Sequence, residues 1–246
     1  MWRFWHWWLL QPLHCPCTTT CVADASAPPS ELQPLLTALP LTPPLLSSLQ
    51  HIPKTGVALR CDHLLDAVAA EQAAGRLRSF RGIKYSNPDL HILANCLAAA
   101  GGAFDIAYGM DEQLLGAAAM GARGAVGSTY NYSGKVAGAV LAAVARGDLA
   151  AARALQRGPQ VLVNLLLAPS RYGPAGCNVN KAIMELRMRA RAGLRSPAAL
   201  AAARAAGART VFAMGARAPV PAVTAEGLAL LEADLDAIGF FSEAWI

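Results

Sequence analysis

Lys84 is the residue of this sequence best placed to act as an amine nucleophile. It follows a glycine and an apolar residue near the end of SFRGIKYS, a run with the composition of a buried strand. A lysine at the partly desolvated mouth of a sheet or barrel loses some preference for its charged form, so its amine can form a Schiff base with a carbonyl substrate. The simpler interpretation, a solvated lysine at a strand end, is the more common one without further context.

Two further groups of polar residues follow the next candidate strands. Asp111 and Glu112 come directly after FDIAYG and open a helix pattern, and Ser128 lies in GSTYN. Carboxylates at a helix start favour the helix dipole, and they can accept hydrogen bonds from a polyhydroxylated ligand. The alternatives are that the acidic pair is only favourable N-terminal charge and that GSTYN is only a turn.

From residue 51 onward, short apolar runs alternate with amphipathic Ala- and Leu-rich stretches. Strands are predicted over 79–86, 104–109 and 124–131, and helices over 61–77, 87–97, 111–122, 131–146, 148–168 and 178–189. Asn87 is the predicted cap of the second helix, and Pro159 is expected to kink the helix over 148–168. This alternation predicts a parallel sheet or barrel with its chemistry at the carboxyl ends of the strands, where Lys84, Gly109, Asp111, Glu112 and Ser128 fall.

Composition excludes several classes of protein. The 246 residues are 54% hydrophobic and 15% charged, enough for a sizeable core, and the net charge of +5 comes from scattered arginines rather than a block. We therefore expect no nucleic-acid partner, and no apolar run is long enough to span a membrane. The spacing of HCPCTTTC matches no common zinc template, so no metal is expected, and Cys61 and Cys96 are interpreted as small buried hydrophobes.

The N-terminal part has a different character from the rest. Residues 1–50 are irregular and proline-rich, and we expect them to lie outside the fold. MWRFWHWWLL resembles a signal peptide only weakly, because His6 interrupts it and aromatic residues dominate it, so a cytoplasmic location is expected. The rest divides into an α/β domain over 51–190, an Ala- and Arg-rich insertion over 191–219 and a C-terminal helix over 220–246.

Several motifs together carry a resemblance to a known family. HIPKTGV, GIKYSNPDL, YGMDEQLLGAAAMGARGAVGSTYNYSGK and NKAIMELR occur in one order over about residues 51–190, and VTAEGLALLEADLDAIGFF adds a weaker match. They resemble the C-terminal part of the N-acetylneuraminate lyase branch of the dihydrodipicolinate synthase superfamily. The resemblance implies an incomplete (β/α)8 TIM barrel, consisting of its last three or four βα units followed by C-terminal helices.

The resemblance also implies a reaction and the residues that carry it. Lys84 would form the Schiff base for reversible retro-aldol cleavage of N-acetylneuraminate, a sialic acid, to N-acetylmannosamine and pyruvate. No metal or dissociable cofactor would be needed, and the family is usually a homotetramer. The residues that would line the pocket for the hydroxyl-bearing part of the sugar are Ser86, Gly109, Asp111, Glu112 and Ser128.

Two departures from the family pattern affect the expected activity. Gln50 stands where the family has a proton-transferring tyrosine, and no Gly-Thr-Thr-Gly-Glu-like loop for the substrate carboxylate occurs in the sequence. Only about 140 residues resemble a barrel that needs about 250, so residues 1–50 are expected to replace the true N-terminal half. Two alternatives remain open, a noncatalytic lyase relic or subunit partner, and another pyruvate-dependent sugar-acid aldolase.

Overall fold

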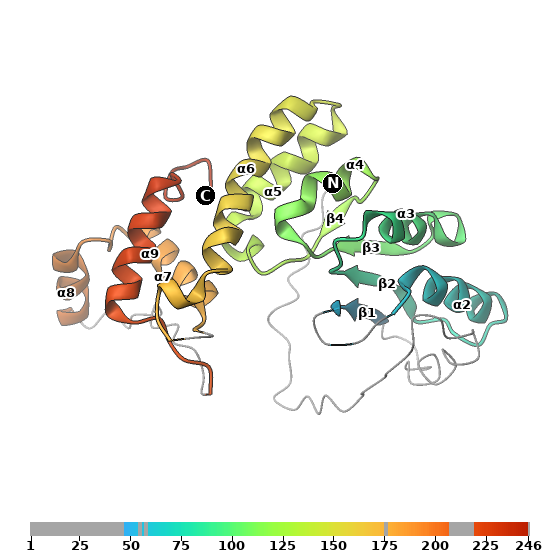
Figure 1. Ribbon diagram of the computed structural model, residues 1–246, viewed down its shortest axis with the longest axis horizontal. Helices are drawn as coiled ribbons and strands as arrows, with labels where there is room; N and C mark the ends of the chain where they lie inside the picture. Colours follow the sequence, from blue (N-terminus) through green and yellow to red (C-terminus); the bar gives the residue numbers. More distant parts are fainter. Residues whose placement is uncertain (1–46, 54–55, 57–58, 175–176, 207–218, 246) are drawn as a thin grey trace.

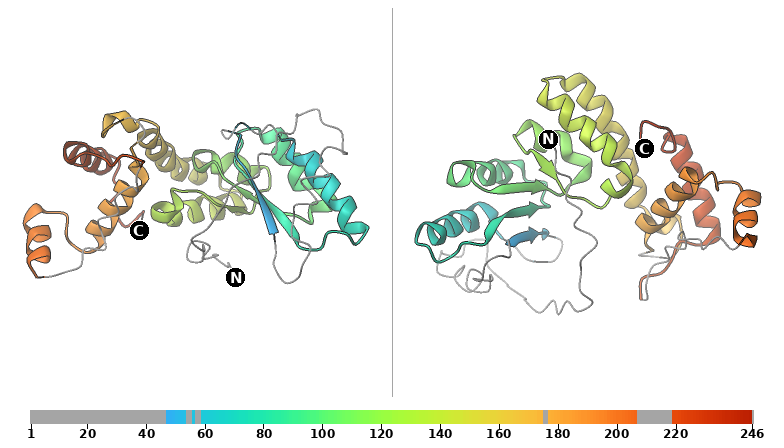
Figure 2. Two further views of the ribbon diagram at one scale, coloured as in Figure 1. Left: turned by 90° about the horizontal axis from the view of Figure 1, so that it is seen from below. Right: turned by 180° about the vertical axis from the view of Figure 1, so that it is seen from behind.

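The computed structural model describes residues 47–53, 56, 59–174, 177–206 and 219–245. A parallel sheet with its helices forms one end of the molecule, and a group of C-terminal helices forms the other (Figures 1 and 2). A helical hairpin lies between the two ends. Among these described residues, every helix is too short or too polar to span a bilayer.

In the described part of the chain, the sheet has four parallel strands in the order β1-β2-β3-β4. The strands are Ser47–His51, Phe80–Tyr85, Asp105–Tyr108 and Gly124–Ala125. Helices connect successive strands, which confirms the prediction of an α/β fold with a parallel sheet. The first strand begins inside the segment that was expected to lie outside the fold, so residues 47–50 belong to the sheet.

Two helices cover one face of the sheet (Figure 1). They are α2, Cys61–Ala73, and α3, Leu90–Ala98. Ile83, Tyr85 and Ile106 point from the strands into their shared core. Cys61 and Cys96, at 0% and 1% exposure, lie in the same core, which confirms that they are small buried hydrophobes.

The start of α3 corrects the predicted helix cap. Asp89, not Asn87, is the N-cap residue, because its carboxylate accepts a hydrogen bond from the backbone N–H of Ile92 at 3.0 Å. The side chain of Asn87 instead accepts from the backbone N–H of Asp89 at 3.0 Å. Both residue types form such local bonds, and the helix therefore starts after the second of them.

The region after β3 is less regular than predicted. Asp111–Gln113 is a single 3-10 turn, and the following helix α4 spans only Leu114–Ala119. The strand predicted over 124–131 pairs only at Gly124–Ala125, after which the chain turns into helix α5 at Tyr130. The polar residues of this region are therefore held by loops and not by a longer strand.

Helices α5, Tyr130–Ala145, and α6, Leu149–Leu166, form the central hairpin. Gly147 at φ +76° makes the turn, and Asp148 caps α6 by accepting from the backbone N–H of Ala151 at 2.9 Å. Helix α6 continues through Pro159 as one element, and the kink expected at this residue stays a prediction.

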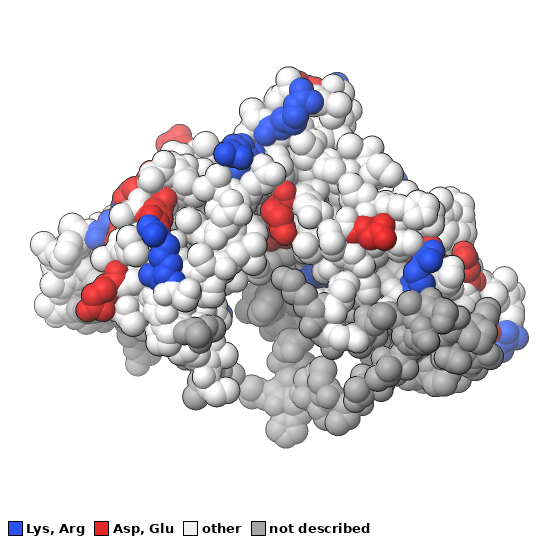
Figure 3. All heavy atoms as spheres, in the orientation of Figure 1, with Lys and Arg blue, Asp and Glu red and all other residues white. Residues whose placement is uncertain are grey.

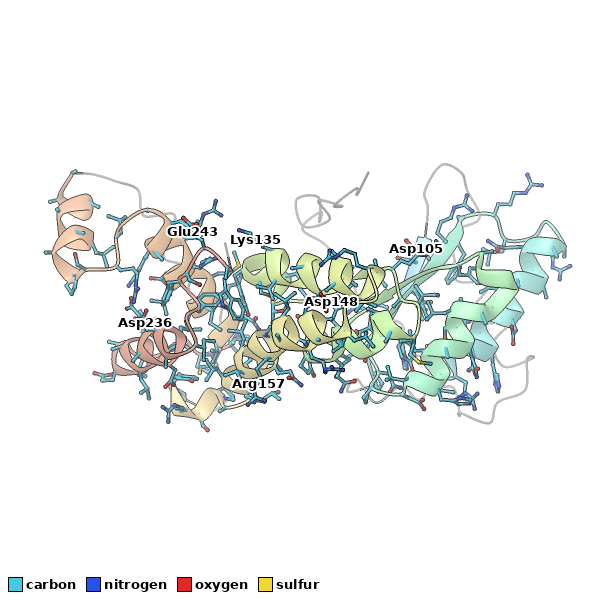
Figure 4. The ribbon with its side chains drawn as sticks, turned by 90° about the horizontal axis from the view of Figure 1, so that it is seen from above. Asp105, Lys135, Asp148, Arg157, Asp236 and Glu243 are labelled. Atoms are coloured by element: carbon cyan, nitrogen blue, oxygen red, sulfur yellow. The ribbon has the colours of Figure 1, made fainter. Side chains whose placement is uncertain are left out.

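Among the described residues, three helices form the C-terminal end of the molecule. They are α7, Val179–Arg191, α8, Pro197–Ala205, and α9, Ala225–Ala237. Their core includes Leu186, Leu231 and Phe240. The hairpin packs into this core through Tyr132 and Val136 of α5 and Leu162 of α6. Lys135 on α5 adds a hydrogen bond, because its Nζ donates to the backbone carbonyl of Glu243 at 2.9 Å (Figure 4).

Candidate active site

Lys84 lies on the face of the sheet opposite to the core formed by α2 and α3. Its neighbours in β2, Ile83 and Tyr85, are buried against those helices, whereas Lys84 points the other way and is half-buried. The parallel register places it between Gln50 on β1 and Ala107 on β3. Lys84 therefore occupies the middle of the sheet, one residue before the end of its strand.

Backbone hydrogen bonds continue across the carboxyl ends of the strands. The N–H of Ser86 donates to His51 O at 3.0 Å, and the N–H of Gly109 donates to Tyr85 O at 2.8 Å. The N–H of Val126 donates to Tyr108 O at 2.9 Å in the same way. The first residue of each loop is thus hydrogen-bonded to the neighbouring strand, so each loop starts from a fixed position.

Gly109 is the point where Lys84 and Ser86 come together. A Cβ atom on Gly109 would lie 2.1 Å from Ser86 Oγ and 3.1 Å from Lys84 Cε. The first distance is impossible and the second is tighter than most real contacts. Glycine is therefore required for the serine hydroxyl and the lysine side chain to converge over the end of β3.

Asp111 is the most buried of the predicted site residues, with 6% of its surface exposed. One carboxylate oxygen accepts from the backbone N–H of Thr129 at 2.9 Å and from its hydroxyl at 2.6 Å. The other oxygen rests against Gly127, where a Cβ atom would lie 1.6 Å from it. Asp111 therefore ties the turn after β3 to the loop after β4.

The electrostatics of Asp111 connect it to Lys84. Burial raises the pKa of the Asp111 carboxyl, and the hydrogen bonds from Thr129 oppose that rise. The positive charge of Lys84 also lowers this pKa, so the two groups are near enough to interact. Asp111 and Lys84 thus belong to one electrostatic cluster at the carboxyl ends of β2 and β3.

Tyr130 faces Asp111 from the start of α5. Within the described residues, neither the Tyr130 hydroxyl nor Asp111 Oδ1 has a hydrogen-bond partner of good geometry, although the phenol is near enough to lower the pKa of the carboxyl. Burial, followed by the charge of Asp111, raises the pKa of Tyr130. The phenol is therefore held in its neutral form.

Glu112 and Ser128 are the more accessible members of the group. Glu112 is half-buried. Burial of the Tyr108 phenol, together with the negative charge of Glu112, raises the pKa of Tyr108 to about 12. Ser128 is exposed, and its backbone carbonyl accepts from Asn131 Nδ2 at 2.9 Å. The two side chains are placed at the surface of the loops that Asp111 joins.

Four residues around the site went unrecognised in the sequence. Thr129 and Tyr130 belong to the GSTYN run that drew attention to Ser128, so that motif carried a signal for them. Gln113, whose Oε1 accepts from the Tyr108 hydroxyl at 3.0 Å, directly follows the acidic pair in YGMDEQLL, whereas Gln156, on α6, carried no signal. Their roles depend on contacts that no local pattern encodes.

Metal binding was not expected from the sequence. In the described part of the chain, no three His, Cys, Asp or Glu side chains gather as a metal site would require. HCPCTTTC lies outside the described residues.

Charged side chains lie singly or in small groups on the face shown in Figure 3.

Known proteins resemble both the sequence and the fold. Residues 54–208 match the Dihydrodipicolinate synthetase family. N-acetylneuraminate lyase of Gallus gallus is 46% identical over 108 residues, which are 43% of this chain and 33% of that protein. Among curated relatives, N-acetylneuraminate lyase B of Xenopus laevis is 42% identical over 149 residues, 56% of this chain and 54% of that protein.

A solved structure gives the same picture at the level of the fold. N-acetylneuraminate lyase from Aliivibrio salmonicida superimposes with a TM-score of 0.58 at 28% identity, covering 78% of this chain and 53% of that one. The chain therefore spans about a third to about half of the length of these relatives.

Proposed function

Because this chain belongs to the dihydrodipicolinate synthetase family, we propose that it is a carbon–carbon lyase of the N-acetylneuraminate lyase type, with Lys84 as its Schiff-base residue. The observation that carries the proposal is the position of Lys84. It lies at the carboxyl end of a central strand, on the face away from the core, with Ser86 and Gly109 against it and Asp111 within electrostatic reach. This arrangement fits class I aldolase chemistry, which needs a positioned amine and no metal.

The proposed reaction begins with attack of the neutral Lys84 amine on the keto carbon of N-acetylneuraminate. Loss of water gives a protonated imine. As the carbon–carbon bond breaks, its electron pair moves into the imine and forms an enamine, while the substrate hydroxyl loses its proton to water and becomes the aldehyde of N-acetylmannosamine. The enamine then takes up a proton, and water hydrolyses the resulting imine to pyruvate and free Lys84.

The remaining predicted residues are proposed to hold the sugar. Ser86 and Gly109 border the amine, and we propose that they line the pocket for the hydroxyl-bearing part of the sugar together with Asp111. Glu112 and Ser128, on the loops joined by Asp111, are assigned to its hydroxyl groups. Side-chain carboxylates and hydroxyls are suited to this task because each accepts hydrogen bonds from sugar hydroxyls.

We further propose that the sheet is part of an incomplete TIM barrel. An eight-stranded barrel of this kind needs about 250 residues, and the matches cover only part of the relatives' length. In this proposal the lyase domain begins with β1 at residue 47 and extends to residue 190, 191–219 form an insertion, and 220–246 carry the C-terminal helix α9. We also propose a homo-oligomer located in the cytoplasm.

A second candidate function is a noncatalytic lyase relic or subunit partner. The observation that favours it is Gln50, which lies beside Lys84 in the register, because an amide has no titratable proton to move during the cleavage. In that case the chain would retain the Schiff-base face without completing the reaction.

Incubation of the purified chain with N-acetylneuraminate, with pyruvate and N-acetylmannosamine measured separately, tests the proposed function. We expect equal amounts of the two products at a slow rate, and none from Lys84→Met. If the wild-type chain forms an imine with pyruvate but releases no product from N-acetylneuraminate, the noncatalytic alternative is correct. Product formation by Lys84→Met would refute the assignment of Lys84.

A further inference from the structure

A side chain from the middle of α6 reaches the turn that carries the acidic pair. Gln156 Nε2 donates to the backbone carbonyl of Asp111 at 3.1 Å, and Gln156 Oε1 accepts from the backbone N–H of Leu115 at 3.0 Å. We propose that Gln156 is a positioning residue that sets the place of Asp111 and Glu112 for the sugar-bearing part of the substrate. This proposal rests on the proposed function above.

The second of these bonds replaces a missing helix cap. Helix α4 begins at Leu114, and its N-cap residue Gln113 makes no capping hydrogen bond with its side chain. The first four N–H groups of a helix have no partner within the helix, and Leu115 supplies one of them. Gln156 satisfies this donor from another helix, so α4 and α6 are joined where α4 starts.

Burial makes the two hydrogen bonds of Gln156 difficult to replace. Gln156 is only 4% exposed, so water cannot readily take over a lost hydrogen bond. Both ends of its amide are used, one as donor and one as acceptor, and a methyl or thioether group could do neither.

The turn over Asp111–Gln113 is held at three independent points. Thr129 binds the Asp111 carboxylate, Tyr108 binds the Gln113 side chain, and Gln156 binds the Asp111 carbonyl. Glu112 lies between the fixed positions, so its place relative to Lys84 depends on them. Gln156 is the contact of the three that brings in α6, whereas Thr129 is the N-cap residue of α5, so both helices of the hairpin support the site.

The test compares Gln156→Met with Arg157→Met, an exposed neighbour on the same helix (Figure 4). Imine formation with pyruvate requires Lys84 but not the sugar contacts. We therefore expect Gln156→Met to form the pyruvate adduct at the wild-type rate while KM for N-acetylneuraminate rises about tenfold. Arg157→Met should change neither value. Equal loss of both activities in Gln156→Met would show a merely structural role, and no change in KM would overturn the proposal.

Hydrogen exchange provides a readout that needs no activity. In the wild-type chain the Leu115 amide should exchange slowly, and in Gln156→Met it should exchange at least about tenfold faster while amides of α2 stay unchanged. A fast Leu115 amide in the wild-type chain would refute the contact even if Gln156→Met fails to fold. A wild-type chain that cleaves no N-acetylneuraminate but shows this protection would refute the proposed function, and with it the role in catalysis, while the structural contact stands.

Discussion

Gln50 of β1 lies directly beside Lys84 of β2 in the parallel register of the sheet. The side chain of residue 50 is exposed, whereas that of Lys84 is half-buried. Lys84 thus has an uncharged amide as its neighbour on one side and the small Ala107 on the other. The pairing places an uncharged, nontitrating group where a proton donor would stand closest to a Schiff base on Lys84.

Replacing Gln50 with tyrosine should therefore increase the rate of cleavage. General acid–base groups contribute about 10²- to 10⁴-fold, and an unoptimised donor should give a smaller gain, about tenfold or more in kcat for N-acetylneuraminate. The measurement is steady-state release of pyruvate. Gln50→Phe supplies the same ring without a proton, and an equal gain in that variant would show that packing, not proton transfer, is responsible.

Gly109→Ala should abolish the convergence of Ser86 and Lys84. The added methyl group would overlap Ser86 Oγ and crowd Lys84 Cε, so one of the side chains or the strand must shift. Overpacking of this kind costs about 1–3 kcal/mol, and we expect pyruvate adduct formation to fall at least about tenfold.

Gly134→Ala is the matched control for that substitution, because Gly134 lies in the interior of α5 with no atom within 4 Å of the added Cβ among the contacts described. It should raise stability by about 1 kcal/mol without affecting the adduct. Denaturant unfolding and adduct yield, measured on both variants, separate the two effects. A normal adduct yield from Gly109→Ala would contradict the assigned geometry.

Asp111 should give the folded chain a characteristic dependence on pH. Burial raises its pKa in the folded state above the ordinary value of 3.8. A carboxyl whose pKa is raised by folding stabilises the fold below its ordinary pKa, and this contribution is lost as pH rises through the folded-state pKa. Unfolding free energies from pH 4 to pH 7 should therefore fall in the wild-type chain relative to Asp111→Asn.

Asp66→Asn, which alters an exposed carboxyl on α2, controls for general effects of charge in that series. The structure indicates that the folded environment disfavours the charged Asp111 carboxylate. If the difference in unfolding free energy between wild type and Asp111→Asn stays constant across the pH range, that conclusion is wrong. A difference of the opposite sign would mean that the bonds from Thr129 outweigh burial.

The sequence predicted the central strands well because their signals are local. Apolar runs that end in a glycine or a polar turn specify β2 and β3, and they place Lys84, Gly109 and Asp111 at one edge of a sheet. The strand β1 was missed over residues 47–50, because a few residues beside a proline-rich stretch become a strand only when β2 is there to pair with them. The strand predicted over 124–131 pairs with β3 only at Gly124–Ala125, because β3 itself ends at Tyr108.

The finer contacts of the site depend on residues far apart in the chain. Thr129 meets Asp111 across 18 positions, and Gln156 meets it across 45. A glutamine in a helix has no periodicity that distinguishes an exposed side chain from one that caps another helix. Asn87 and Asp89 could both cap a helix, and only the folded backbone decided between them.

Trapping with pyruvate and borohydride tests the central claim about Lys84 most directly. The purified chain has four lysines, at positions 54, 84, 135 and 181, and peptide mass mapping distinguishes them. The account predicts a reduced pyruvate adduct on Lys84, none in Lys84→Ala, and an undiminished adduct in Lys135→Ala. Folded protein that carries no adduct, or one spread evenly over the lysines, would contradict the assignment of Lys84 as the Schiff-base residue.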